Sequence, residues 1–192
     1  LKGDVVLDKE MSDKLMSEGW KESNLVINTN DYKVTLAEGV SKNILDRVIV
    51  KGNVEVEGEL ELGSKSFVNG KYTTAYGTAY EDASTQEQTI DNQIIDIAEG
   101  ATVTVVSPIE DNNTTNWRQD KLVIGDNEGT LDIDAIVKKF EIKNNEGKMT
   151  VGAKAEVTLA KTSYNNAGGY VTIEAGGDLS GEGKAVFVNK GT

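Results

Sequence analysis

Two stretches of the chain decide the fold: IGDNEGTLDI (124–133) and IKNNEGKMTV (142–151). An offset of 18 residues places Asn-Glu-Gly on Asn-Glu-Gly and aligns the aliphatic positions on either side. Each copy holds two short alternating segments, which is typical of strands with one buried face. Because Asn and Gly tolerate left-handed backbone angles, the shared tripeptide predicts a tight corner between the strands, with positive φ at Gly129 and Gly147.

Related corners recur along the chain. Their glycines stand at positions 39, 58, 100, 129, 147 and 176, with spacings of 19, 42, 29, 18 and 29 residues. A period of about twenty residues, interrupted by insertions, is typical of a β-solenoid, in which each repeat buries its inward side chains only against its neighbours. An antiparallel β-sandwich is the alternative, since it also has short strands and frequent turns. The repeat and the single Gly/Asn corners favour the solenoid.

Residues 53–62 (NVEVEGELEL) show the clearest alternation. One set is expected to face the core: Val54, Val56, Leu60 and Leu62. The other set is expected to form one straight outward row of carboxylates about 6.5–7 Å apart: Glu55, Glu57, Glu59 and Glu61. Such a row is interpreted as a solvated face that blocks edge pairing, because a straight row does not converge on a metal ion.

The composition narrows the range of possible functions. The 192 residues include 32 Asp and Glu against 20 Lys and Arg, giving a net charge of −12, and they contain no His and no Cys. Thiol nucleophiles, disulfides, Cys/His zinc sites and imidazole catalysis are therefore excluded. The negative charge argues against nucleic-acid partners. No apolar stretch approaches the roughly 18 residues of a membrane span, so direct membrane insertion is not expected. We predict no cofactor and no metal.

The chain divides into an N-terminal segment, 1–22, and a β-solenoid region, 23–192. Residues 8–20 predict one amphipathic helix, with Asp8 as its cap, lying as a lid over the end of the core. The repeat is interrupted at about 66–93 and 107–120, which predicts two inserted loops. The chain lacks an initial Met and ends within a strand-like pattern, so we expect a fragment of a longer protein.

The run 121–192, ending in IEAGGDLSGEGKAVFVNKGT, resembles the passenger regions of bacterial autotransporters and other large β-helical surface adhesins. The resemblance lies in degenerate units of aliphatic, Gly, Asn and Asp residues and in the absence of Cys. It implies a secreted, surface-displayed β-helix used for adhesion or self-association, and it supplies no catalytic positions. The favoured architecture is an all-β, right-handed parallel β-helix with a short N-terminal capping helix.

Candidate binding residues lie in the two insertions. The first holds Tyr72, Tyr76 and Tyr80, whose rings could stack on sugars or could pack the insertion onto the flank of the solenoid. The second holds Trp117 and Arg118, residue types enriched at protein–protein hot spots. The aromatic residues of either insertion could instead hold their own loop in place and contact no partner. We expect partners to meet these loops, and we expect the 107–120 loop to contribute little to the core.

Three functions stay open. The favoured one is a non-enzymatic structural or adhesive segment at the bacterial cell surface or outside the cell. Its partner is a host or bacterial surface protein, a glycan, or a second copy of the chain. The alternatives are a carbohydrate-binding module and a carboxylate-based polysaccharide hydrolase or lyase. The last is the weakest, because nucleophile-elbow and P-loop motifs are absent and only two Arg are present, Arg47 and Arg118.

Overall fold

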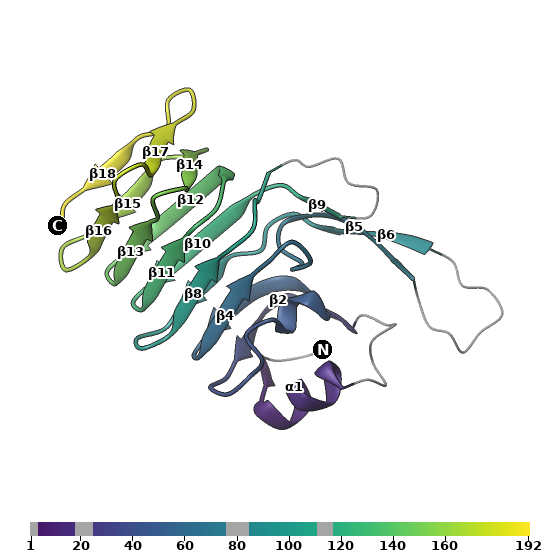
Figure 1. The fold of residues 1–192 in the computed structure, drawn as a ribbon. Helices are drawn as coiled ribbons and strands as arrows, with labels where there is room; N and C mark the ends of the chain where they lie inside the picture. Colours follow the sequence, from purple (N-terminus) through teal and green to yellow (C-terminus); the bar gives the residue numbers. More distant parts are fainter. Residues whose placement is uncertain (1–3, 18–24, 76–84, 111–116) are drawn as a thin grey trace.

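The structure, a computed structural model, describes residues 4–17, 25–75, 85–110 and 117–192, and the statements below refer to these residues. At 30–31, 73–75, 85–88 and 117–118 only the backbone is described. The fold is mainly β, with one short helix, α1 (Lys9–Met16). Figure 1 shows rows of strands running side by side from the N-terminal end to the C-terminal end of the molecule.

Two large parallel sheets form the body. The first has ten strands: β1 (Val5–Leu7), β2 (Leu25–Leu36), β3 (Val48–Val56), β7 (Ile95–Ile97), β10 (Leu122–Asn127), β12 (Val137–Asn145), β14 (Glu156–Leu159) and β17 (Asp178–Gly181) in order, with β15 (Ser163–Asn165) beside β12 and β18 (Phe187–Asn189) beside β15. The second has five strands: β4 (Glu59–Leu62), β8 (Thr102–Val105), β11 (Thr130–Ile133), β13 (Lys148–Val151) and β16 (Tyr170–Ile173). The parallel pairing in both does not fit the antiparallel sandwich considered as the alternative.

The predicted 18-residue register is confirmed. In the ten-stranded sheet β10 pairs with β12 so that Ile124 lies opposite Ile142. In the five-stranded sheet β11 pairs with β13 so that Leu131 lies opposite Met149. The chain therefore passes from one sheet to the other and returns one layer further along, and the stacking of these layers is solenoid-like.

The alternation at residues 53–62 places the apolar side chains in the core as predicted. Val54, Val56, Leu60 and Leu62 are each at most 2% exposed. The glutamate row, however, is not one straight strand, because a corner at residues 57–58 separates β3 from β4. Glu55 consequently lies on the ten-stranded sheet and Glu61 on the five-stranded sheet. The two-residue alternation continues unbroken through the corner, so this period in the sequence could not reveal where the chain turns.

One inward position recurs through eight layers of the ten-stranded sheet. Its registered occupants are, in order, Leu7, Leu36, Val56, Ile97, Asn127, Asn145, Asn165 and Asn189, called here the inner column. The first four are aliphatic and the last four are asparagines. The first seven members are at most 3% exposed, and Asn127, Asn145 and Asn165 are 0% exposed, whereas Asn189 at the C-terminal end of the column is exposed.

The asparagines of the inner column form a hydrogen-bonded ladder. The side-chain Nδ2 of Asn127 donates to Oδ1 of Asn145 (2.6 Å), Asn145 to Asn165 (2.6 Å) and Asn165 to Asn189 (2.7 Å). Nδ2 of Asn127 and of Asn145 also donates to a carbonyl of the next corner, at Lys148 and Tyr170. Buried amides need such partners, because an unpaired polar group in the interior is costly. At the start of the ladder, Asn127 Oδ1 faces the aliphatic half of the column and has no partner among the described residues.

The corner glycines are required for a different reason from the one predicted. Neither Gly129 nor Gly147 has positive φ, so the expected left-handed conformation is wrong. A Cβ at Gly147 would instead lie under 3.0 Å from the backbone of Gly129 and Glu128, because successive corners stack on one another. The next glycine in this stack is Gly169, whose Cβ would meet Asn145, and not Gly176 as the sequence spacing indicated.

Helix α1 begins where predicted, since Asp8 accepts a hydrogen bond from the N–H of Met11 (2.9 Å). It ends at Met16 rather than extending to residue 20. Leu15 packs into the main core, but Met11 is 41% exposed, and Ser12 is the buried residue beside it, accepting from the N–H of Ser41 (2.8 Å). The helix lies at the end of the stack opposite the C-terminus, as expected of a lid (Figure 1).

Candidate functional site

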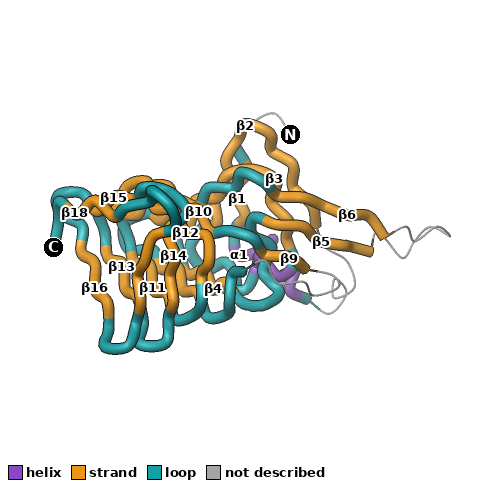
Figure 2. The backbone as a smooth tube through the Cα atoms, turned by 90° about the horizontal axis from the view of Figure 1, so that it is seen from above, coloured by secondary structure: helices purple, strands orange, loops and turns teal. Residues whose placement is uncertain are grey.

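The two predicted insertions meet in one small antiparallel sheet. Its strands are β6 (Thr85–Ile90), β5 (Gly70–Ala75) and β9 (Trp117–Gln119), with β5 in the centre. Tyr72 lies opposite Trp117, and Lys71 lies opposite Arg118. Figure 2 shows this sheet extending away from the parallel stack on one flank. Tyr72 and Trp117, which were predicted as candidates in separate insertions, are therefore cross-strand neighbours. The sheet of β5, β6 and β9 is called here the inserted sheet.

A second small core fixes the inserted sheet to the stack. Ile49 from β3 packs with Phe67, Tyr72 and Ile90. The Phe67 and Tyr72 rings meet edge to face, with centroids 4.7 Å apart and planes at 81°, a favourable aromatic geometry. Tyr72 is 1% exposed, and burial raises the pKa of its phenol well above the usual value. Tyr72 therefore packs the insertion onto the flank and offers no open ring face for stacking.

Hydrogen bonds close the base of the first insertion. The side chain of Asn69 donates to the carbonyl of Gln93 and accepts from its N–H, both at 2.8 Å. Gln93 in turn donates through Nε2 to the carbonyl of Val50 (3.0 Å) in the ten-stranded sheet. These buried amides join residues 24 positions apart in the sequence. The insertion accordingly leaves and re-enters the stack at one fixed point.

The second insertion contributes more to the core than expected. Ile109 is 1% exposed, belongs to the main core, and forms a parallel bridge with Val137. Gln119 is also buried and donates through Nε2 to the carbonyls of Ser66 (2.6 Å) and Gly63 (3.1 Å). The expectation that 107–120 is a dispensable loop is therefore wrong, because both of its ends are built into the stack.

The other candidate residues are only partly placed. Trp117 and Arg118 lie on β9 of the inserted sheet, where their backbone alone is described. Tyr76 and Tyr80 fall outside the described residues, as does the predicted division of the chain at residue 22. The N-terminal segment is nonetheless joined to the stack, since β1 is a strand of the ten-stranded sheet.

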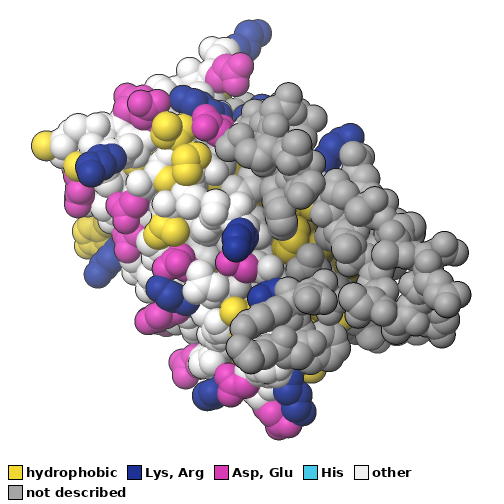
Figure 3. All heavy atoms as spheres, turned by 45° about the vertical axis from the view of Figure 1, so that its right-hand side comes forward, with side chains coloured by type: hydrophobic (Ala, Val, Ile, Leu, Met, Phe, Trp, Pro, Cys, Tyr) yellow, Lys and Arg dark blue, Asp and Glu magenta, His cyan; other side chains and the backbone are white. Residues whose placement is uncertain are grey.

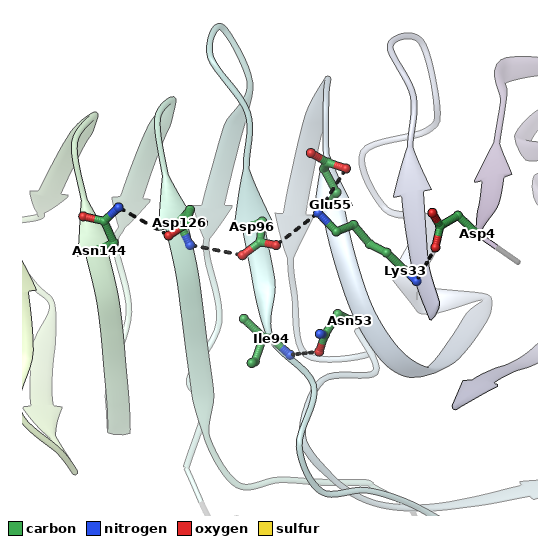
Figure 4. Close-up of polar contacts among 8 residues, drawn as sticks. All are labelled: Asp4, Lys33, Asn53, Glu55, Ile94, Asp96, Asp126 and Asn144. Carbon is green, nitrogen blue, oxygen red and sulfur yellow. Dashed lines mark hydrogen bonds and ion pairs between the residues drawn. The ribbon is translucent and has the colours of Figure 1, made fainter. Parts of the chain in front are cut away.

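A row of polar side chains crosses the outer face of the ten-stranded sheet (Figure 4). Lys33 Nζ lies 3.3 Å from Glu55 Oε2 and 3.4 Å from Asp96 Oδ2. Asp96 Oδ1 accepts from the N–H of Asp126 (3.0 Å), and Asp126 Oδ1 accepts from Nδ2 of Asn144 (3.3 Å). We call these five residues the outer row. Sequence analysis did not find it, because its members belong to layers separated by insertions.

The electrostatics of the outer row are those of a structural network. Desolvation lowers the pKa of Lys33, but the hydrogen bonds and charges of Glu55 and Asp96 outweigh it, and the net pKa is raised. On the other sheet, hydrogen bonds from Lys42 and Asn43 lower the pKa of Glu61. Each carboxylate named here is held by a neighbouring layer. The arrangement keeps layers in register and does not present an unengaged carboxylate pair for acid–base chemistry.

The described residues contain no group of three or more Asp or Glu side chains placed to hold a metal ion. Figure 3 shows acidic and basic side chains interspersed over one face, without a large area of a single sign. No helix in the described part of the chain is both long enough and apolar enough to cross a membrane.

Comparisons with protein-family models, with curated proteins and with solved structures gave no match to this chain.

Proposed function

We propose that this chain is a segment of a right-handed parallel β-solenoid that serves as a non-enzymatic structural and adhesive element of a secreted or surface-displayed bacterial protein. Its partner is a surface protein, a glycan or a second copy of the chain. The inserted sheet is the element that meets the partner. The location outside the cell or on its surface rests on the pattern-level resemblance and on the absence of Cys.

The solenoid assignment is supported by the parallel register of the layers. From the asparagine of one layer to that of the next, the inner column advances by 18, 20 and 24 residues. In the first of these steps the chain leaves β10 at its last residue, Asn127, passes through β11 and runs along β12 to its last residue, Asn145. The right-handed form is favoured because crossover connections between parallel strands are right-handed in nearly all proteins.

The observation that carries the adhesive role is the way the two insertions are built. Two interruptions of the repeat, separated by a complete layer, pair into one sheet that is fixed by its own core and by the Asn69–Gln93 hydrogen bonds. A rigid scaffold that holds variable segments in a defined position is the usual arrangement for a binding surface. A loop that only linked two layers would need neither a separate core nor a partner strand.

The test compares tyrosines on the insertion with tyrosines on the stack. The double variant Tyr76→Ala/Tyr80→Ala alters the first insertion, and Tyr164→Ala/Tyr170→Ala removes two exposed rings from the stack as the matched control. Binding of the purified chain to immobilised matrix proteins and to a glycan array is measured, and sedimentation velocity reports self-association. We expect the insertion variant to bind about tenfold more weakly, in keeping with loss of an aromatic contact, and the control to bind unchanged.

Two results would overturn the proposal. Equal binding by both variants would remove the inserted sheet from the binding surface. Release of reducing sugar from a polysaccharide by the unaltered chain would make it an enzyme. Circular dichroism and melting curves of both variants are recorded first, because only correctly folded proteins can be compared.

A further inference from the structure

Two neighbouring cavities lie beside the base of the inserted sheet. The first, about 290 Å³, is lined by residues of β5 and β6 and by Asp120, Lys121 and Lys139. The second, about 260 Å³, is lined by Lys121, Lys139, Lys143 and Lys161, and its apolar lining includes Val123 and Phe140. Because Lys121 and Lys139 line both, the two cavities lie on either side of these two lysines. The second is called here the lysine cavity.

The charge of the lysine cavity is opposite to that of the chain. Four lysines and one carboxylate, Glu141, line it, although the protein carries a net charge of −12. Lys161 pairs with Glu141 (3.3 Å), and Lys139 pairs with Asp120. No described carboxylate lies within 4.0 Å of Lys121 or Lys143. Two positive charges in this cavity therefore lack an ion-pair partner in the described part of the chain.

The lysines are stacked by the repeat itself. Leu122 lies opposite Phe140 in the ten-stranded sheet, so Lys121, which directly precedes β10, is a neighbour of Lys139 on β12. Like charges facing each other across strands are destabilising, and a bound anion relieves the repulsion. One layer further along, Phe140 lies opposite Leu159, and Lys161 follows Leu159 by two positions. Neighbouring lysines that outnumber the nearby carboxylates lower the stability of a sheet unless an anion is bound there.

The lining also limits the kind of anion. Ile94, which is half-buried, and Ala160, which is exposed, give the cavity an apolar wall, which suits the C–H face of a sugar ring. Its volume of about 260 Å³ lies just below the usual range for small-molecule sites and suits one or two sugar rings. Lysine ammonium groups act as compact point charges, and the arginine fork favoured for bidentate phosphate recognition is absent from this lining.

We propose that the lysine cavity binds a carboxylate-bearing saccharide, with the carboxylate held by Lys121 and Lys143 and the ring packed on Ile94 and Ala160. A longer chain of the same sugar continues past Lys121 and Lys139 toward the first cavity. This site is separate from the partner-binding role of the inserted sheet, so each proposal can fail without the other.

The test is a titration followed by NMR, using the disaccharide of galacturonate as probe. Its methyl ester is the matched control ligand, since it has the same rings without the charge. The variant Lys121→Gln/Lys143→Gln is compared with Lys148→Gln/Lys154→Gln, which removes two exposed lysines from another part of the surface. We expect the acid to bind at least about tenfold more tightly than the ester, and the first variant alone to lose about tenfold in affinity. Raising the salt concentration should weaken binding of the acid.

Several results would overturn the proposal. Equal affinity for the acid and the ester would remove the role of the carboxylate. Equal losses in the two lysine variants would place the anion elsewhere on the surface. Displacement of the disaccharide by inorganic sulfate at the same concentration would make this a general anion site rather than a saccharide site. A tyrosine variant of the insertion, Tyr76→Ala/Tyr80→Ala, should bind the disaccharide normally, which separates this site from the inserted sheet.

Discussion

The two halves of the ten-stranded sheet carry different chemistry at equivalent positions. In the first four layers the inner column holds Leu7, Leu36, Val56 and Ile97, and in the last four it holds asparagines. The outer row changes near the same place, from the Lys33 ion pairs to the hydrogen bond between Asn144 and Asp126. Within the inner column, the aliphatic side chains are held by burial, whereas the asparagine side chains also form directional hydrogen bonds.

This difference has a physical consequence for register. An aliphatic column tolerates small displacements, because apolar packing has no preferred direction. A ladder of amides fixes each layer relative to the next, because every step needs a donor and an acceptor at hydrogen-bond distance. The amide half is the part of the chain that runs on without a long insertion, whereas the aliphatic half supports the inserted sheet.

The middle of the ladder gives the largest effect. Asn145→Leu leaves Asn165 Oδ1 without its donor and Asn127 Nδ2 without one of its two acceptors. We expect the free energy of unfolding to fall by about 3 kcal/mol, measured by urea denaturation. The control is Ile97→Val in the aliphatic half, which should cost about 1 kcal/mol. Equal losses in the two variants would show that the amides add nothing beyond packing.

The stacked corners give the second-largest expected loss in the free energy of unfolding. Gly147→Ala places a Cβ against the backbone of the preceding corner, so we expect a loss of about 2 kcal/mol in unfolding free energy. Gly63→Ala is the control, because a Cβ there meets no atom within 4 Å and its φ is not positive. Its effect should stay within about 0.5 kcal/mol. If both variants unfold at the same denaturant concentration, the corners do not stack as described.

The junction between the halves gives a smaller effect. Asn127→Leu removes the donor to Asn145 but also removes Asn127 Oδ1, which already lacks a partner among the described residues. Asn145 Oδ1 and the carbonyl of Lys148 each lose a donor, but the unpaired Oδ1 of Asn127 is removed, so the expected loss is about 1 kcal/mol, well below that of Asn145→Leu. Chemical denaturation of both leucine variants under the same conditions measures the difference. A loss at Asn127 as large as at Asn145 would contradict the direction of donation in the ladder.

The repeat could be predicted from the sequence where the same type of side chain occupies the equivalent position of successive strands or layers. The 18-residue match between 124–133 and 142–151, the inward set at 53–62 and the approximate sites of insertion all rest on such positions. The inner asparagines were missed because Asn is usually a turn residue, and its burial depends on an identical residue in the next layer. A column of Asn at positions 127, 145, 165 and 189 is the signal that could have shown the ladder.

The inserted sheet could not be predicted, for a different reason. Pairing of β5 with β9 joins residues 70–72 to 117–119, and nothing local to either segment specifies the other. The contact exists because the stack holds the ends of both insertions on one flank. The lysine cavity likewise depends on register, which brings Lys121 beside Lys139. Contacts between layers that repeat with the period of the chain can be predicted from the sequence, whereas contacts between segments that do not repeat cannot.

The smallest effect concerns pH and is confined to the first half of the outer row. The pKa of Lys33 is raised in the folded state, so its ion pairs stabilise the fold below the ordinary lysine pKa of 10.5 and cease to do so as pH rises past the folded value. Because the pair is partly exposed, we expect under about 0.5 kcal/mol. Unfolding midpoints of wild type and Lys33→Gln, measured from pH 8 to pH 11.5, should differ most at the low end of this range, and the difference should shrink as pH rises past 10.5. Taking the difference between the two proteins cancels other groups that titrate there, including Tyr72, whose raised pKa also lowers stability at high pH.

The matched substitution Asn144→Ala in the amide half removes a neutral hydrogen-bond donor, so its effect should not change over the same pH range. A pH-independent difference for Lys33→Gln would mean that its side chain contributes by packing rather than by charge.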